Sequence, residues 1–141
     1  MRRFYRLRLR QNLRHGITTD EAIAEAERGR SEGGIPIGAV LVHEGAIIGR
    51  GHNRRVQQGS AVLHGEMDAL ERAGRQPASI YRASVMYTTL SPCAMCTGAI
   101  LRYGTPHVVI GENQTFLGEE ELCRARAACG WKWSRTNAAS G

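Results

Sequence analysis

The sequence lacks any long hydrophobic run: apolar residues make up 42% of the 141 but are broken into short segments. A helix that crosses a bilayer needs about 20 predominantly apolar residues, so no membrane partner is expected. Arginines interrupt each apolar stretch near the start, which argues against a secretory signal. With no internal repeat and no interior linker, the length predicts one core-forming domain, and we expect a cytoplasmic protein.

Acidic residues are missing from positions 1–16, which hold six arginines. Of the 19 basic residues in the chain, the remaining 13 are matched by 13 acidic ones. Nucleic-acid binding depends on a basic face, so nucleic acid is not an expected partner of the folded part. We expect 1–16 to be a disordered basic leader; a misassigned start codon, an organelle-targeting segment and a basic arm are the alternatives.

The order of predicted elements is typical of an α/β protein. The patterns predict helices near 18–33, 64–72 and 91–103, strands at 35–42, 46–51, 83–90 and 107–110, and a polar loop at 53–60. Helices that alternate with strands usually cover both faces of a sheet. We therefore predict a three-layer α-β-α fold with a central mixed sheet.

Two short motifs carry the chemistry: His64-Gly65-Glu66 and Pro92-Cys93-Ala94-Met95-Cys96, each at the amino end of a predicted helix. Taken alone, the cysteine pair is also typical of a redox centre or of half a structural zinc site. Cys93 and Cys96 share a helix face, so both sulfurs can bind one ion, with His64 as a third ligand. Three protein ligands leave a position for water, as a catalytic zinc requires. We predict one catalytic Zn²⁺ per subunit.

Glu66 lies two residues after His64, beside the predicted ion but poorly placed to bind it. In isolation, it reads as an exposed first-turn glutamate favoured by the helix dipole. Beside the cysteine pair it completes the H-x-E and P-C-x-x-C signature of zinc-dependent nucleobase deaminases. We therefore predict that Glu66 is catalytic: it takes a proton from water, gives it to the ring nitrogen and then protonates the departing amine.

Longer segments around these motifs resemble fungal-type cytosine deaminase, within the cytidine/deoxycytidylate deaminase-like zinc deaminases. The shared segments are 33–39, 49–53, 63–66, 88–100 and 111–113, so the resemblance covers roughly residues 18–121. It implies a cytidine deaminase-like fold and a homodimer that hydrolyses free cytosine to uracil and ammonia in pyrimidine salvage. It also implies a deaminase domain over 17–121, followed by an atypical tail over 122–141.

The resemblance further implies a set of polar substrate contacts. Asn53 would hydrogen-bond the carbonyl edge of the base, and Ser91 would contact the departing amine through its backbone. The backbone of Gly65 and the side chain of Glu66 would complete these contacts. A simple turn role is the alternative for Asn53.

Apolar contacts are implied as well. Phe116 matches an aromatic residue that covers the flat face of the base, and Ile35 and Leu90 would help to wall the pocket. An ordinary core position is the alternative for Phe116.

After Glu121 the sequence departs from the family, which continues with a strand, a helix and an acidic, aromatic segment that closes over the substrate. Residues 122–141 contain no acidic residue and no strand-like run. We expect a shifted or truncated reading frame here, with one sheet edge uncovered and the pocket left open.

Other functions share these motifs. Relatives that deaminate adenosine in tRNA usually have Ala between the His and the Glu and an acidic residue before the Pro-Cys, where this sequence has Gly65 and Ser91. Deamination of guanine is a further alternative. A third is a catalytically inactive zinc-binding domain retained for dimerisation, which would bind zinc but release no ammonia from any base.

Overall fold

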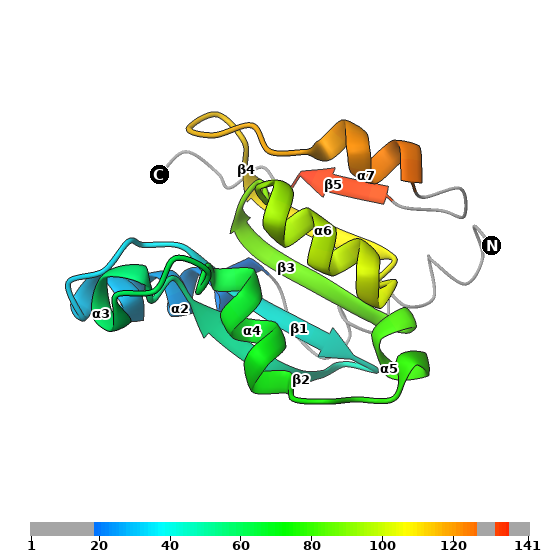
Figure 1. Ribbon diagram of the computed structural model, residues 1–141, viewed down its shortest axis with the longest axis horizontal. Helices are drawn as coiled ribbons and strands as arrows, with labels where there is room; N and C mark the ends of the chain where they lie inside the picture. The colour runs from blue at the N-terminus through cyan, green and yellow to red at the C-terminus, as the bar shows by residue number, and fades with distance from the viewer. Residues whose placement is uncertain (1–18, 127–131, 136–141) are drawn as a thin grey trace.

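A five-stranded mixed sheet with strand order β2-β1-β3-β4-β5 forms the centre of the computed structural model, which describes residues 19–126 and 132–135 (Figure 1). β1 pairs antiparallel with both β2 and β3, whereas β3–β4 and β4–β5 are parallel. The strands are β1 (Gly38–His43), β2 (Ala46–His52), β3 (Ser84–Leu90), β4 (His107–Glu112) and β5 (Lys132–Arg135).

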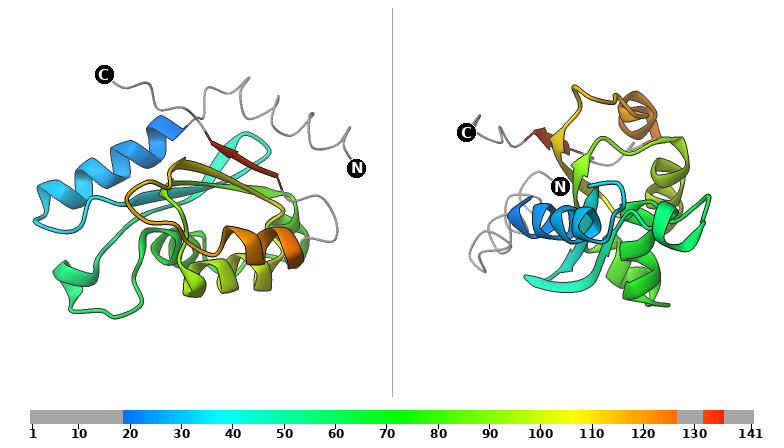
Figure 2. Two further views of the ribbon diagram at one scale, coloured as in Figure 1. Left: turned by 90° about the horizontal axis from the view of Figure 1, so that it is seen from above. Right: turned by 90° about the vertical axis from the view of Figure 1, so that its left-hand side faces the viewer.

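Helices cover both faces of this sheet, as the two views of Figure 2 show. One face carries α2, which contacts β1, β2 and β3, and the other carries α4 and α6. The prediction of three α-β-α layers around a mixed sheet is therefore confirmed. The helices are α2 (Thr19–Ser31), α3 (Arg55–Gln58), α4 (Gly65–Ala73), α5 (Ala78–Arg82), α6 (Ala94–Tyr103) and α7 (Glu120–Arg126).

The core consists of two apolar clusters, one on each face of the sheet. Successive side chains of a strand point to opposite faces. In β1, Val40 and Val42 therefore join the cluster under α2, while Ala39 and Leu41 join the cluster that includes residues of α4 and α6. Burial on both faces explains why β1 reads as a continuous apolar run rather than as an alternating one.

Several elements differ from the sequence-based expectation in their bounds or their presence. The strand predicted from Ile35 begins only at Gly38, the predicted loop 53–60 contains the short helix α3, and α5 was not predicted. The helix predicted to open at Ser91-Pro92 begins at Ala94, with Cys93 as its N-cap residue. Four- and five-residue helices are too short to show a helical period, which explains why α3 and α5 were missed.

The expectations of a strand-free tail and an uncovered sheet edge are wrong. β5 pairs with β4 in parallel, from His107–Lys132 to Ile110–Arg135. Such pairing uses backbone groups, so it does not require an apolar pattern in the sequence. The helix α7 also crosses the boundary predicted at residue 121, while the predicted leader 1–16 lies outside the described residues. Within 19–126 and 132–135, no helix is both long and apolar enough to span a membrane.

The position of the core predicts that two leucines contribute very differently to stability. Leu41 is fully buried in β1, whereas Leu117 is 66% exposed. We expect Leu41→Ala to lower the free energy of unfolding by about 2–5 kcal/mol, because it removes buried methyl groups and leaves a cavity. Leu117→Ala should change it by less than about 0.5 kcal/mol. Urea unfolding followed by circular dichroism measures both, and equal losses would contradict this description of the core.

Candidate active site

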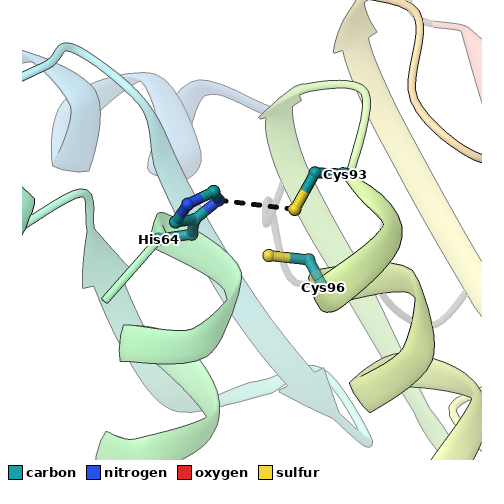
Figure 3. A group of neighbouring side chains, drawn as sticks. All are labelled: His64, Cys93 and Cys96. Carbon is teal, nitrogen blue, oxygen red and sulfur yellow. Dashed lines mark hydrogen bonds between the residues drawn. The ribbon is translucent and has the colours of Figure 1, made fainter. Parts of the chain in front are cut away.

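The starts of two helices bring the predicted metal ligands together. His64 is the N-cap residue of α4 and Cys93 that of α6, both with extended backbone and without a side-chain capping hydrogen bond. Cys96 lies in the first turn of α6 and is fully buried. Figure 3 shows the imidazole and the two sulfurs converging from the two helices.

The distances among these three residues suit a zinc ion. Nδ1 of His64 lies 3.5 Å from Sγ of Cys93, and one ligand atom from each residue lies within 4.8 Å of the others. Tetrahedral zinc, with bonds of about 2.0 Å to nitrogen and 2.3 Å to sulfur, separates such ligands by about 3.5–3.8 Å. Burial and then the nearby Glu66 carboxylate raise the pKa of the Cys96 thiol. A bound cation lowers the pKa of a thiol, because the thiolate is the form that binds the metal.

Glu66 is held in place beside these ligands. Its side chain lies in the first turn of α4 and is 3% exposed. Oγ1 of Thr88 in β3 donates a hydrogen bond to Oε1 of Glu66 at 2.8 Å. The carboxylate is thus fixed at the border between the ligand group and the adjacent pocket, where it can move protons at one defined position.

A pocket of about 300 Å³ opens next to the ligand group, a size suited to a small molecule. Phe116 lines it and is 44% exposed, so the pocket reaches the surface there. Gly65 is buried but does not line the pocket; a Cβ on it would lie 3.2 Å from the carbonyl oxygen of Ile37. The lining residues are Ile35, Ile37, Asn53, Arg55, His64, Glu66, Leu90, Ser91, Cys93 and Phe116.

Backbone contacts fix Asn53 in the pocket wall. Its N–H donates to the carbonyl oxygen of Ile37 at 2.9 Å, and its Oδ1 accepts from the backbone N–H of Arg55 at 3.1 Å. Asn53 is 2% exposed and lines the pocket.

Ser91 is fixed from the opposite side by the segment that carries Phe116. Its hydroxyl donates to Oε1 of Glu120 at 2.9 Å and accepts from the N–H of Gly118 at 2.9 Å. A Cβ on Gly118 would overlap the carbonyl oxygen of Pro92, so this close approach requires glycine.

Sequence reasoning missed Ile37, Arg55 and Thr88. Ile37 and Arg55 line the pocket, and Thr88 holds Glu66. A signal for Thr88 was present: it lies two residues after Met86, whose side chain packs on the α4 side of β3, so the period of two places Thr88 on that side as well. Arg55 lies in the segment predicted to be a loop, where no period of apolar residues could single it out.

Known proteins share these features. The family model for the cytidine and deoxycytidylate deaminase zinc-binding region matches residues 15–112. A cytosine deaminase of Candida albicans is 56% identical over 102 residues, which cover 72% of this chain and 68% of that protein. A tRNA-specific adenosine deaminase of Streptococcus pyogenes is 42% identical, with 72% of this chain and 65% of that protein covered. The chain therefore spans about two thirds of each of these relatives.

Solved structures agree with the fold. A guanine deaminase from Bacillus subtilis superposes with a TM-score of 0.59 at 28% identity, over 76% of this chain and 66% of that one. The predicted resemblance to cytosine deaminase, the zinc cofactor and the hydrolytic deaminase class are all confirmed. The chain belongs to the cytidine and deoxycytidylate deaminase family of zinc-binding deaminases.

Proposed function

We propose that this chain hydrolyses free cytosine to uracil and ammonia. The observation that carries the proposal is the position of Glu66: a buried carboxylate, held by Thr88, between a three-residue zinc ligand group and a pocket for a small molecule. The fungal cytosine deaminase at 56% identity supports cytosine as the base.

Bound zinc supplies a Lewis acid that lowers the pKa of water to near neutrality. The Glu66 carboxylate would accept one proton from a water molecule and deliver it to the ring nitrogen next to the amine-bearing carbon. It would then take the second proton from the same oxygen, which becomes the carbonyl oxygen of uracil, and pass it to the departing amine. The water oxygen forms a bond to this carbon, the carbon–nitrogen bond breaks, and ammonia leaves. His64, Cys93 and Cys96 act only as ligands.

Pocket residues orient the base. The proposed roles are a hydrogen bond from the Asn53 amide to the carbonyl edge and a backbone contact from Ser91, whereas Gly65 lies behind the pocket lining and supports the position of Glu66. Phe116 covers the flat face of the ring, while Ile35 and Leu90 form the walls. Fixing a flat base near Glu66 lowers the entropic part of the barrier.

Deamination of adenosine in tRNA is the second candidate, because the streptococcal tRNA deaminase is 42% identical. Against it stand Gly65 and Ser91 at the two positions that usually differ in tRNA-acting relatives. The even balance of basic and acidic residues after position 16 also lacks the excess of positive charge that phosphate binding needs.

The proposal extends to assembly and location. We propose a homodimer, as the resemblance to cytosine deaminase implies, and the exposed apolar side chains of Val56 and Val62 support it. We also propose a cytoplasmic role in pyrimidine salvage, because cysteine ligands such as Cys93 and Cys96 need a compartment that keeps thiols reduced.

Assembly is tested directly by sedimentation equilibrium. Two copies that bury Val56 and Val62 between them should give twice the mass of the chain at micromolar concentration. Val62→Asp should shift the equilibrium toward the monomer because it places a charge in an apolar contact. A wild-type protein that sediments as a monomer would contradict the proposal.

The substrate is tested by measuring ammonia release from cytosine, guanine and adenine, and from a tRNA anticodon stem-loop. We expect release from cytosine only, loss of release after treatment with a zinc chelator, and recovery when zinc is added back. Preference for the stem-loop or for guanine would replace the proposed substrate. Stoichiometric zinc with no ammonia from any substrate would show an inactive zinc-binding domain.

Glu66→Gln tests the proton-transfer role. This variant keeps the shape of the side chain and the contact with Thr88 but removes the base, so kcat should fall by about 10²–10⁴-fold. Zinc content, measured by atomic absorption, should stay at one ion per chain. Glu71→Gln on the exposed side of the same helix is the matched control and should keep wild-type turnover. Near-normal kcat in Glu66→Gln would refute the role.

A further inference from the structure

A fully buried imidazole outside the zinc site lies between two carboxylates. His52, the last residue of β2, has 0% exposure. Its Nδ1 lies 3.0 Å from Oε2 of Glu25 in α2, and its Nε2 lies 2.9 Å from Oε2 of Glu32, just beyond the same helix. A neutral imidazole has one N–H donor, whereas the protonated ring has two. Both contacts are therefore hydrogen bonds when the ring is protonated.

Charged groups around the ring hold these carboxylates in place. Glu25 also contacts Arg28 at 3.4 Å and Arg50 at 3.7 Å. Glu32 accepts a hydrogen bond from Gln57 at 3.2 Å. The hydrogen bond from His52 is the main cause that lowers the pKa of the Glu32 carboxyl, which keeps that group ionised.

A third acid binds the backbone of the same residue. The N–H of His52 donates to Oδ2 of Asp68 in α4 at 3.0 Å, and Nε of Arg54 donates to the same oxygen at 2.9 Å. His52 is thus attached to α2 through its ring and to α4 through its backbone. These two helices lie on opposite faces of the sheet (Figure 2).

The backbone of α2 lies close to this ring. A Cβ on Gly29 would lie 3.1 Å from Cδ2 of His52 and 3.4 Å from its Cβ and Cγ. Glycine at this position lets the helix backbone lie directly against the imidazole. The ring is therefore in contact with the helix on one side and with the two carboxylates at its edges.

The next residue along the chain is Asn53, whose amide lies in the pocket wall. Side chains of consecutive residues at a strand end point to opposite faces. When the His52 ring is held on the α2 face, Asn53 is directed to the pocket face. A rotation of the strand end that released the ring would move the Asn53 amide with it.

We propose that His52 is a positioning residue: its bridge between Glu25 and Glu32 fixes the end of β2 so that Asn53 presents its amide to the base. The proposal rests on the proposed function, because it takes Asn53 as the residue that binds the substrate. His52 itself does not line the pocket and touches no reacting atom.

A double-mutant cycle with His52→Gln and Asn53→Ala tests this route. Glutamine keeps one N–H₂ donor group but cannot bridge both carboxylates in the geometry of the ring. We expect His52→Gln to lower kcat/KM for cytosine by about tenfold, a size typical of coupling between neighbours in one network. Most of the loss should appear in KM, because the position of a binding group changes, while zinc content stays at one ion per chain.

In the Asn53→Ala background, His52→Gln should change kcat/KM by less than about twofold, because the Asn53 amide through which His52 acts is already absent. His43→Gln in β1 is the matched control and should leave kcat/KM unchanged, since His43 contacts neither carboxylate. Equal losses in both backgrounds, or a fall in melting temperature with kcat/KM unchanged, would overturn the proposal.

A spectroscopic measurement tests the His52 bridge independently of the proposed activity on cytosine. In long-range ¹H–¹⁵N spectra, the Nδ1 signal of His52 should move in Glu25→Gln and the Nε2 signal in Glu32→Gln, because each nitrogen contacts one of these carboxylates. Ring signals that respond to neither substitution would overturn the bridge. If the wild-type protein releases no ammonia from cytosine while both signals respond, the proposed function fails and the bridge stands.

Discussion

The position of α4 against the sheet determines most of what the site can do. This helix supplies His64 at its start and Glu66 in its first turn, and it reaches the sheet only because β2 has glycine where it crosses. A Cβ on Gly49 would lie 2.2 Å from the carbonyl oxygen of Ala69, and a Cβ on Gly51 would lie 2.3 Å from the N–H nitrogen of Ala69. Such close contact between helix and sheet places Glu66 within hydrogen-bond distance of Thr88 in β3.

The same helix also connects the two sides of the pocket. Asp68, 3% exposed, accepts hydrogen bonds from the backbone of His52 and the side chain of Arg54, which flank Asn53 in the chain. Arg72 also donates to the other oxygen of Asp68 at 3.4 Å, so an ionised carboxylate is stable here because all three partners are donors and two are cations. One metal ligand and the proton carrier thus lie at the start of α4, which also binds the residues on both sides of Asn53; this suits chemistry that tolerates little displacement.

Much of this arrangement could be predicted from the sequence, because its strongest signals are local. The apolar run at β1 and the two motifs at helix starts predicted a three-layer fold and a His64, Cys93 and Cys96 ligand group, and the structure has both. The run beginning at Ile35 was assigned entirely to a strand, since apolar residues that line a pocket resemble apolar residues that pair in a sheet.

Features that depend on tertiary contacts were not predictable in this way. The pairing of β5 with β4 uses backbone groups, and the contact between Thr88 and Glu66 joins residues 22 positions apart. The bridge from His52 to Glu25 and Glu32 joins the end of β2 to α2 and the residue that follows it, on the face of the sheet opposite to α4. The acidic and basic residues of α2 are typical of a solvent-exposed helix, and periodicity in a single sequence does not reveal that Glu25 is buried.

The absence of side-chain capping at the starts of α4 and α6 has a consequence for protein engineering. Serine, aspartate or asparagine at an N-cap position stabilises a helix by about 1 kcal/mol over residues that do not cap. Consensus rules for helix design would therefore select those residues at positions 64 and 93, and each choice would delete a ligand. Thermostability campaigns on this scaffold need to exempt both positions, because local helix energetics and coordination chemistry impose opposite demands there.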